Sequence, residues 1–385
     1  MPASKYCSNG SVTSLLRAVL YSAALLTLSA CSTQEVAQPE APDETVTKVP
    51  AKAEKPQRDV SQLRITIAGT GDIMLGTNFP KNILPDDDGV SFLEHVTPVL
   101  NKADIAFGNL EGVLMDGGEP VKECKNPDAC YLFRSPTRYA KLLAAAGFDL
   151  MSLANNHARD FGEEGRDASM AALDAVGIRH SGREGTAASW QVGELRIAMI
   201  AFSPTKGSWN LLDTDLAVWA VSGLARHHDI VIVSFHGGAE GFEGAERIAF
   251  GMEFAYGEQR GNVVEFSRAV IDAGADLVLG HGPHVPRAME IYNDRLIAYS
   301  LGNFATYYGI SVSGVKGYAP IVEAVLDGNG HFIQGKLHSN IQVRPGGPRP
   351  DNQQRALNMI RELTLQDFPN GALEFSEDGA LTGPQ

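Results

Sequence analysis

From about residue 63 onward, the chain alternates between short apolar runs and amphipathic stretches with helical spacing. Apolar runs of this length are typical of buried strands. The clearest of them cover residues 65–68, 104–107, 148–153, 195–202, 229–235, 275–279 and 321–326. Strands that alternate with helices indicate a largely parallel sheet covered by helices. The pattern therefore predicts an α/β fold, with one continuous domain over residues 61–345 and a C-terminal helix and tail over residues 346–385.

The amphipathic stretches carry helix start and stop signals. Residues 136–146 begin with Pro136 and are followed by Gly147, the arrangement favoured at the two ends of a helix. Further helices are predicted over residues 91–101, 163–176, 261–273 and 353–365. Two apolar arms flank Asn293-Asp294, which is a hairpin signal. Part of the sheet is therefore expected to be mixed.

The N-terminus reads as a targeting segment. Lys5 and Arg17 precede an apolar run over residues 18–28, and this combination is typical of a secretory signal peptide. The run is too short for a comfortable transmembrane helix. It ends in Leu28-Ser29-Ala30-Cys31, which resembles the lipobox of bacterial lipoproteins. The resemblance implies a lipoprotein signal peptide over residues 1–30 and lipidation of Cys31; the alternative is an ordinary signal peptide with a chance cysteine.

Residues 31–60 are rich in Pro, Ala, Glu, Lys, Thr and Gln. Such a segment cannot bury enough apolar surface to fold, so we expect a flexible tether between the lipid and the domain. Ser32 follows the cysteine, which by resemblance favours the outer membrane if the host has two. The expected location is therefore the cell envelope, with the protein extracytoplasmic and bound to the membrane through the lipid on Cys31.

Charge and cysteine content narrow the choice of partners and covalent links. The formal net charge of −14 argues against a nucleic-acid partner, which would favour a basic face. Of four cysteines, Cys124 and Cys130 remain once Cys7 has left with the signal peptide and Cys31 is lipidated. In an oxidising compartment this pair favours a disulfide closing a small loop. A zinc site would need two further cysteines or histidines nearby.

Several apolar runs end in residue types that bind metals or phosphate. These residues are Asp72, Asn109 with Glu111, Asn156 with His157, His236, and His281 with His284. Ligands of α/β sheets bind at the carboxyl ends of the strands, so these side chains should share one rim. Each of them also has an ordinary explanation, such as a turn-forming Asp72 or a core histidine at position 236. Chance placement of all of them at the same end is much less plausible.

Mixed nitrogen and oxygen ligands suit Zn, Mn, Fe or Mg. Two divalent ions about 3.5–4 Å apart would clamp an oxyanion and activate a bridging water. Glu111 is the best candidate for the carboxylate that bridges such a pair. Asp72 and His284 could complete one metal, and Asn156, His236 and His281 could hold the other. His157 would then be free to act as a general acid toward the leaving group.

Some further residues are candidates for binding substrate. Asn109 and Asn303 each lie at a strand end and could line the site. Arg159 and Arg287 flank the histidine motifs, and guanidinium groups bind carboxylate or phosphate in a bidentate manner. Glu240 closely follows His236 and could contact substrate. The alternatives are surface salt bridges for the arginines and a solvated loop acid for Glu240.

The motifs at the strand ends, taken together, resemble those of the CapA family of poly-γ-glutamate capsule biosynthesis proteins. They are Gly71-Asp72-Ile73-Met74-Leu75-Gly76, Asn109-Leu110-Glu111-Gly112, Asn155-Asn156-His157, Phe235-His236-Gly237-Gly238, Gly280-His281-Gly282-Pro283-His284 and Ser300-Leu301-Gly302-Asn303-Phe304. That family is similar to the calcineurin-like metallophosphoesterases. The resemblance implies a four-layer αββα sandwich of the metallophosphoesterase type with a two-metal site at one edge.

Two positions differ from the general phosphoesterase pattern. That pattern begins Asp-x-His, whereas Ile73 and Met74 follow Asp72 here. The second motif has Glu111 where phosphoesterases place Asp. Both features resemble CapA proteins.

Two functions are compatible with these observations. One is a lipid-anchored, metal-dependent hydrolase or transferase of capsule biosynthesis that acts on an anionic polymer or a phosphoester. The other is a non-catalytic factor that binds or helps export the polymer. Membrane capsule-synthesis subunits are further candidate partners in either case.

Overall fold

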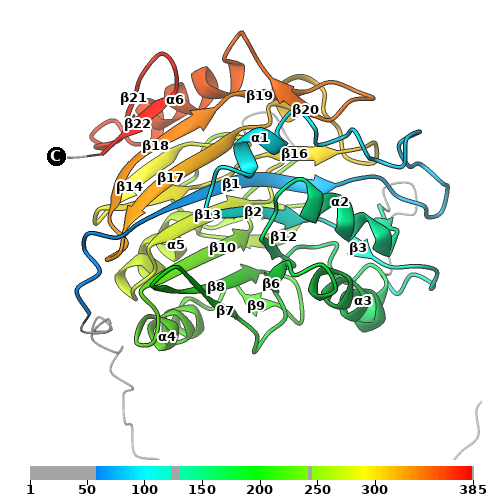
Figure 1. Ribbon diagram of the computed structural model, residues 1–385, viewed down its shortest axis with the longest axis horizontal. Helices are drawn as coiled ribbons and strands as arrows, with labels where there is room; N and C mark the ends of the chain where they lie inside the picture. The colour runs from blue at the N-terminus through cyan, green and yellow to red at the C-terminus, as the bar shows by residue number, and fades with distance from the viewer. Residues whose placement is uncertain (1–57, 123–130, 242–244, 384–385) are drawn as a thin grey trace, which may run out of the picture. The chain divides into compact units, whose positions relative to one another are not determined.

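Two large β-sheets organise the part of the chain that the computed structural model describes, which is residues 58–122, 131–241 and 245–383. All of these residues belong to one structural unit, residues 48–385 (Figure 1). The expected signal peptide, Cys31, nearly all of the tether and the pair Cys124–Cys130 lie outside the described residues. Among the described residues, no helix is long and apolar enough to span a membrane.

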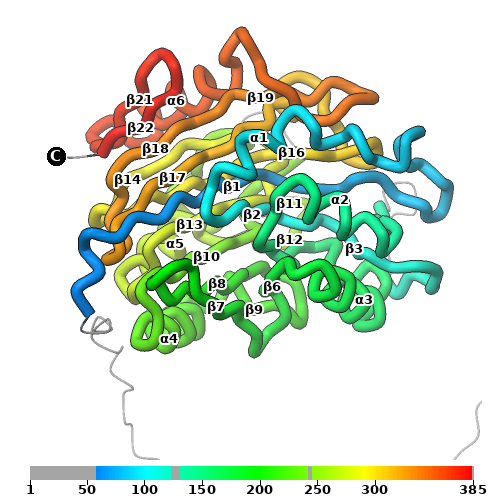
Figure 2. Tube along the Cα trace, viewed as in Figure 1, coloured from blue at the N-terminus to red at the C-terminus, as the bar shows by residue number. Residues whose placement is uncertain are grey.

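Within the described residues, the first sheet has nine strands. They are β1 (Arg64–Met74), β2 (Ile105–Leu110), β5 (Leu150–Ser152), β6 (Arg179–Ser181), β16 (Asn303–Thr306), β17 (Ile321–Asp327), β18 (Phe332–His338), β21 (Glu374–Phe375) and β22 (Ala380–Thr382). Their order is β21-β22-β18-β17-β1-β2-β5-β6, with β16 paired to β1. Figure 2 shows β17 beside β1, although the two strands lie far apart in the sequence.

The second sheet has seven strands within the same described ranges. They are β7 (Ala188–Val192), β8 (Leu195–Ser203), β9 (Trp209–Asn210), β10 (Ile230–His236), β13 (Leu277–His281), β14 (Met289–Tyr292) and β15 (Arg295–Ala298). Their order is β14-β15-β13-β10-β8-β7, with β9 paired to β8. The pairs from β8 through β10 and β13 to β15 are parallel, and β14 is antiparallel to β15.

Four of the five predicted helices are shorter in the structure, and the fifth keeps its length but is shifted by two residues. The helices are α1 (Thr97–Leu100), α2 (Ala140–Ala145), α3 (Gly162–Asp174), α4 (Thr214–Ala225), α5 (Val263–Asp272) and α6 (Arg355–Asp367), with 3₁₀ turns η2 (Thr137–Tyr139) and η3 (Gly314–Gly317). Short strand pairs join β3 (Val113–Leu114) to β4 (Arg134–Ser135), β11 (Glu253–Ala255) to β12 (Glu258–Gly261), and β19 (Asn340–Gln342) to β20 (Pro348–Pro350). Sequence reasoning missed α4 altogether.

The strands are apolar on both faces, because each sheet packs against the other sheet on one face and against helices on the opposite face. In β10, Ile230 and Ile232 join the core between the two sheets, whereas Val231 and Val233 pack in the cluster with α4 and α5. This is the two-residue alternation of a strand, with both faces buried as in parallel sheets. The other sheet packs its outer face against α2 and α3 in the same way. The expected four-layer αββα sandwich is confirmed.

Strand β1 is longer than its apolar run, which ends at Ala68. It continues to Met74 through two glycines that sequence inspection would place in a turn. A Cβ atom on Gly71 would collide with the backbone carbonyl of Gly302. The glycine therefore permits two chain segments to touch, and Asp72 N donates a 2.9 Å hydrogen bond to Gly302 O. As a result Asp72 is held on a strand, opposite Asn303 of β16.

The nine-stranded sheet continues beyond residue 345. Strand β22 pairs antiparallel with β18, and Leu381 is buried in the core between the sheets. Leu357 and Ile360 of α6 pack in the same core.

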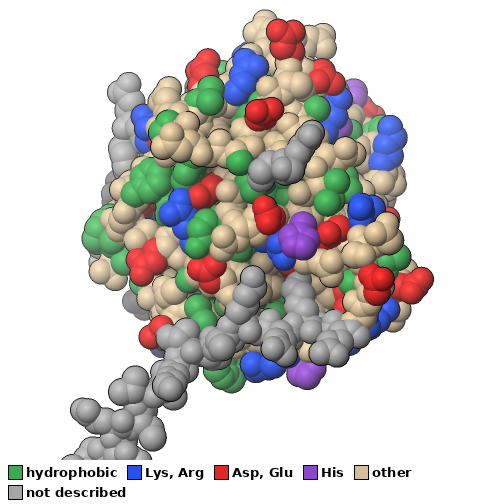
Figure 3. Space-filling model, turned by 90° about the vertical axis from the view of Figure 1, so that its left-hand side faces the viewer, with side chains coloured by type: hydrophobic (Ala, Val, Ile, Leu, Met, Phe, Trp, Pro, Cys, Tyr) green, Lys and Arg blue, Asp and Glu red, His purple; other side chains and the backbone are tan. Residues whose placement is uncertain are grey.

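Figure 3 shows the face at the left of Figure 1, where acidic and basic side chains are interspersed. Neither sign gathers into a continuous patch in that view.

Helix α4 offers a test of local stability. Asp213 is its N-cap, and the Asp213 side chain accepts a 3.0 Å hydrogen bond from Leu216 N. Asp213→Ala should lower the free energy of unfolding by about 1 kcal/mol, because it leaves that amide unpaired. Urea denaturation measures the change, and Asp215→Ala in the first turn serves as the control. Equal effects of the two substitutions would contradict the capping role.

Candidate metal centre

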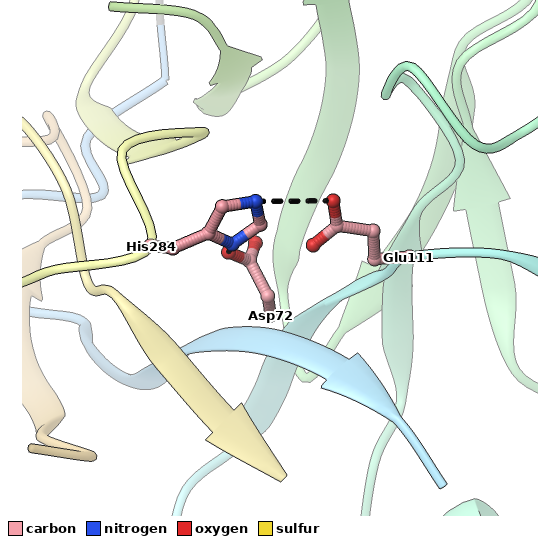
Figure 4. A group of neighbouring side chains, drawn as sticks. All are labelled: Asp72, Glu111 and His284. Atoms are coloured by element: carbon pink, nitrogen blue, oxygen red, sulfur yellow. Dashed lines mark hydrogen bonds and ion pairs between the residues drawn. The ribbon is translucent and has the colours of Figure 1, made fainter. Parts of the chain in front are cut away.

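Asp72, Glu111 and His284 meet at the carboxyl ends of the strands. Asp72 lies on β1, Glu111 directly follows β2, and His284 lies in the loop after β13 (Figure 4). Their ligand atoms all lie within 4.8 Å of one another. His284 Nδ1 is 3.0 Å from Asp72 Oδ2, and His284 Nε2 is 3.6 Å from Glu111 Oε1. Three segments far apart in the sequence thus bring together one imidazole and two carboxylates.

Parallel pairing of β1 and β2 explains why the two carboxylates are neighbours. Asp72 lies opposite Asn109, and Glu111 N donates a 2.9 Å hydrogen bond to the carbonyl of Ile73. Both carboxylate residues are buried: Asp72 is completely buried, and Glu111 is 1% exposed. Buried carboxylates are costly unless they are paired or bind a cation.

Four predicted ligands carry buried atoms that have no hydrogen-bond partner among the described residues. They are Glu111 Oε1 and Oε2, Asn156 Oδ1, His236 Nε2 and His281 Nδ1. Buried polar atoms are rarely left unpaired, so these atoms call for a missing partner. Of these four residues, Glu111 belongs to the close group with Asp72 and His284, and His236 is linked to that group through Asn109. Carboxylate, amide and imidazole are the donors that Zn, Mn, Fe or Mg accept. The residues present therefore fit divalent metal ions.

The hydrogen bonding of His281 defines which nitrogen is available. His281 Nε2 lies 2.9 Å from the carbonyl oxygen of Thr70, which can only accept. Nε2 must therefore carry the proton, and Nδ1 keeps a free lone pair. A neutral imidazole in this tautomer is a ready metal ligand. Burial favours that neutral form, because it lowers the pKa of His281.

Asn109 contacts Asp72 and holds its carboxylate in place. Its Nδ2 donates a 2.8 Å hydrogen bond to Asp72 Oδ1 and lies 3.4 Å from His236 Nδ1. Asn155 Nδ2 in turn donates to Asn109 Oδ1 at 3.1 Å. Asn155 Oδ1 accepts a hydrogen bond from the backbone N–H of His157 at 3.0 Å. Sequence reasoning included Asn155 in a motif but missed its role, which is to fix the segment that carries His157.

His157 lies beside an aspartate that sequence reasoning did not single out. His157 Nδ1 is 2.8 Å from Asp160 Oδ2, and Asp160 Oδ1 is 3.0 Å from Lys122 Nζ. Donation of the Nδ1 proton to Asp160 leaves Nε2 as the nitrogen that can exchange protons with a ligand. Burial lowers the pKa of His157, although Asp160 counteracts it. The spacing of three residues from His157 was the available signal for Asp160.

The backbone at His284 is strained. Its φ of 59° lies in the left-handed region, which costs a non-glycine residue about 1–3 kcal/mol. Asn303 Oδ1 lies 3.0 Å from His284 Nδ1, and Asn303 Nδ2 donates to the carbonyls of Ser311 and Lys316. Such strain persists only where the surroundings hold it. Here Asp72 and Asn303 orient the ring so that it faces Glu111.

The charges of the group influence one another strongly. Burial raises the pKa of Glu111 well above its usual value, while the nearby His284 counteracts this. Burial would also raise the pKa of Asp72, but the hydrogen bond and charge of His284 overcome it and lower the pKa to about 2. Burial lowers the pKa of His236 to about 3. Asp72 is therefore ionised and His236 neutral at physiological pH, as metal ligands must be.

The remaining candidates for substrate contact lie at different distances from this group. Glu240 Oε2 is 3.2 Å from His284 Nε2, and Glu240 Oε1 accepts a 3.2 Å hydrogen bond from Arg260. Arg287 is completely buried, where it pairs with Glu253 at 2.9 Å and donates to the carbonyls of Ala239 and Ala245. Arg287 therefore anchors the backbone on both sides of Glu240.

Arg159 lies further out, on the first turn leading into α3. Its Nε is 2.7 Å from Glu163 Oε1, and its Nη1 donates a 3.1 Å hydrogen bond to the carbonyl of Lys206. Among the described residues, neither Arg159 nor Arg287 has a hydrogen bond or ion pair with Asp72, Glu111 or His284. Glu240 and Asn303 are thus the outlying candidates that the fold brings into contact with the group.

Residues 66–308 match the family model described as bacterial capsule synthesis protein PGA_cap. The chain belongs to this family. The match spans more than half of the 385 residues and includes every ligand candidate, from Asp72 to His284. The resemblance to CapA proteins drawn from the motifs is therefore confirmed.

Two relatives cover most of the chain. The capsule biosynthesis protein CapA of Bacillus anthracis is 26% identical over 83% of this chain and 77% of its own length. The PGA biosynthesis protein CapA of Bacillus subtilis (strain 168) is 28% identical over 86% of this chain and 85% of its own length.

Solved structures with a similar arrangement are more distant. One is a 5'-nucleotidase precursor from Thermus thermophilus, with a TM-score of 0.41, 13% identity and coverage of 79% of this chain. Another is the purple acid phosphatase PPD1 from yellow lupin, with a TM-score of 0.36, 13% identity and coverage of 79%. The chain spans 59% and 56% of the lengths of these two proteins.

Proposed function

We propose that this protein is a lipid-anchored cell-envelope protein of capsule biosynthesis, of the poly-γ-glutamate type, with a metal-dependent hydrolase or transferase site. The observation that carries the proposal is the close group of Asp72, Glu111 and His284, in which both buried carboxylate oxygens of Glu111 have no hydrogen-bond partner among the described residues. A purely structural fold has no need to bury them. The names of the two Bacillus relatives, which refer to capsule and PGA biosynthesis, support the place of action.

The proposed site would hold two divalent ions, and Glu111 would be a ligand of both. Asp72 and His284 would complete one position, and Asn156, His236 and His281 would complete the other. Such ions, when bound, polarise a phosphoryl or carbonyl oxygen and activate water. Asn109 and Asn303 hold the ligands Asp72 and His284 in place.

His157 is the proposed general acid. Asp160 keeps the proton on Nδ1 by accepting it in a hydrogen bond, and it orients the ring. In the imidazolium form, in which both ring nitrogens carry a proton, His157 Nε2 can deliver its proton to the oxygen or nitrogen of a leaving group, and Nδ1 keeps its own. An anionic polymer or a phosphoester suits the site, because cationic metal ions offset its negative charge.

Metal content and turnover test this proposal together. The purified protein should contain divalent metal and should hydrolyse either a bis-aryl phosphodiester or poly-γ-glutamate, with loss of turnover in chelator. Protein that takes up no Mn, Zn, Fe or Mg would rule out the metal-dependent site. Metal uptake without turnover on either substrate would favour the alternative of a non-catalytic polymer-binding or export factor.

The lipid anchor has its own test. Cys31→Ala should move the protein from the membrane fraction to the soluble fraction, because the thiol that accepts the lipid is gone. Cys7→Ala is the matched control, since Cys7 lies within the expected signal peptide. Immunoblots of fractionated cells measure the distribution. Unchanged fractionation of Cys31→Ala would contradict lipidation, while co-purified membrane capsule-synthesis subunits would identify the remaining partners.

A further inference from the structure

Arg166 is a buried charge with most of its hydrogen-bonding capacity unused. It lies on α3 and is 1% exposed. Its Nη1 donates a 2.6 Å hydrogen bond to the carbonyl of Gly207, but Nε and Nη2 have no hydrogen-bond partner among the described residues. Burial lowers the pKa of this guanidinium. Buried arginines are normally paired with a carboxylate, so the two free donors call for an acceptor.

The carboxylates around Arg166 are engaged by two other arginines. Glu163 pairs with Arg159 at 2.7 Å and with Arg183 at 2.9 Å. Asp167 pairs with Arg183 at 2.5 Å. Three guanidinium groups therefore share two carboxylates, which leaves an excess positive charge at the buried member of the set. A bound anion would neutralise it.

The guanidinium groups of Arg159 and Arg166 converge on the backbone at Gly207. A methyl group on Gly207 would lie 3.4 Å from Arg166 Nη1, 3.7 Å from Arg166 Nη2 and 3.7 Å from Arg159 Nη1. Nitrogens of both guanidinium groups thus lie within 4 Å of one point beside the Gly207 backbone. Next to it, the hydroxyl of Ser208 is buried and has no hydrogen-bond partner among the described residues. An oxyanion would satisfy both kinds of donor.

The strands place this cluster on the same rim as His157. Arg183 follows the carboxyl end of β6, and residues 204–208 follow the carboxyl end of β8. Arg183 and Ser208 form an isolated β-bridge, and Glu184 N donates to the carbonyl of Gly207 at 3.0 Å. Arg159 lies two residues after His157 and reaches the carbonyl of Lys206. The cluster therefore lies on the same rim as the candidate metal centre, beside the segment that carries His157.

We propose that Arg166, Arg159 and Ser208 form a second anion site, which binds a carboxylate or phosphate group next to the metal centre. The planar guanidinium groups suit the paired oxygens of either group. A polymer with an acid group on every unit would place one acid group at this site while another part of the polymer reaches His157. That assignment of the ligand rests on the proposed function, whereas anion binding itself does not.

Anion-dependent stabilisation of the full chain, purified in detergent and treated with chelator, tests the site. Inorganic phosphate and glutarate are titrated separately, with chloride at matched ionic strength as the reference. The wild-type melting temperature should rise with phosphate, glutarate or both, because a ligand that binds only the folded state stabilises it. Arg166→Met should weaken the apparent affinity by about 10- to 100-fold, since charge-assisted hydrogen bonds are lost.

Matched variants distinguish binding at this cluster from binding elsewhere on the protein. Arg179→Met, on an exposed strand position, should retain the wild-type response. Ser208→Ala should weaken the response with little change of volume, and it decides the case if Arg166→Met fails to fold. Glu111→Gln should retain the response, which keeps this test independent of the metal centre. An anion response absent from the wild type, equal in Arg166→Met or Ser208→Ala, or lost only in Glu111→Gln would overturn the proposal.

Discussion

Replacing Glu111 by glutamine should yield a folded protein whose affinity for divalent metal is lower by about 100-fold or more. Both carboxylate oxygens of Glu111 are buried and lack a hydrogen-bond partner among the described residues. Losing groups that merely support a metal ligand costs about 10–100-fold in affinity, so loss of the proposed shared ligand should cost at least as much. Metal content by mass spectrometry and the melting temperature with Mn²⁺ or chelator measure the effect.

The metal-free form of Glu111→Gln should be as stable as the wild type or more stable. Glutamine removes a buried acidic group whose oxygens accept no hydrogen bond from the described residues, and the energetic cost of burying that group disappears with it. Glu323→Gln on β17 is the matched control. Glu323 does not belong to the group, and its Oε2 lies 3.2 Å from Nε2 of His338. Wild-type metal affinity in Glu111→Gln would contradict the proposed ligand set.

His157→Ala should lower kcat by about 10²- to 10⁴-fold, the usual contribution of a positioned acid or base. The substitution removes the imidazole that is paired with Asp160. Metal content should stay at the wild-type level, because His157 is not among the proposed ligands. KM should change little if the loss lies in proton transfer rather than in binding.

Asp160→Asn separates orientation from proton transfer. The amide can no longer accept the Nδ1 proton in the same way, so the ring should lose its preferred tautomer and kcat should fall by a smaller factor than in His157→Ala. His180→Ala is a suitable control, because His180 also pairs with an aspartate but is not part of the site. Its Nε2 lies 3.1 Å from Oδ1 of the exposed Asp174. Unchanged turnover in His157→Ala, with metal bound, would eliminate the acid role alone.

Local sequence was sufficient to predict which strand ends carry chemistry. Asp72, Glu111 and His284 each follow a recognisable apolar run, and parallel strands must end at one edge. The structure accordingly brings their ligand atoms within 4.8 Å. The alternation of helices and strands likewise predicted an α/β fold, because periodicity of apolar residues records which faces are buried.

Local sequence was less reliable where glycine or a polar stretch had two meanings. The segment Gly69–Gly71 resembles a turn, yet it continues β1, because Gly71 makes room for the backbone of Gly302. Residues 91–101 have helical spacing, yet only Thr97–Leu100 forms an α-helix. In both places packing against distant segments outweighs local preference.

The sequence by itself thus determined the class of fold, the family and the residue types at the rim, since these follow from periodicity and short motifs. Only the tertiary structure decided how those residues are supported. The contact of Asn109 with Asp72, the pairing of Asp160 with His157, and the unused donors of Arg166 beside Gly207 were recognised once the chain was folded. Hydrogen bonds and burial depend on which segments come into contact in the folded protein, and contacts between distant segments cannot be derived from a single sequence.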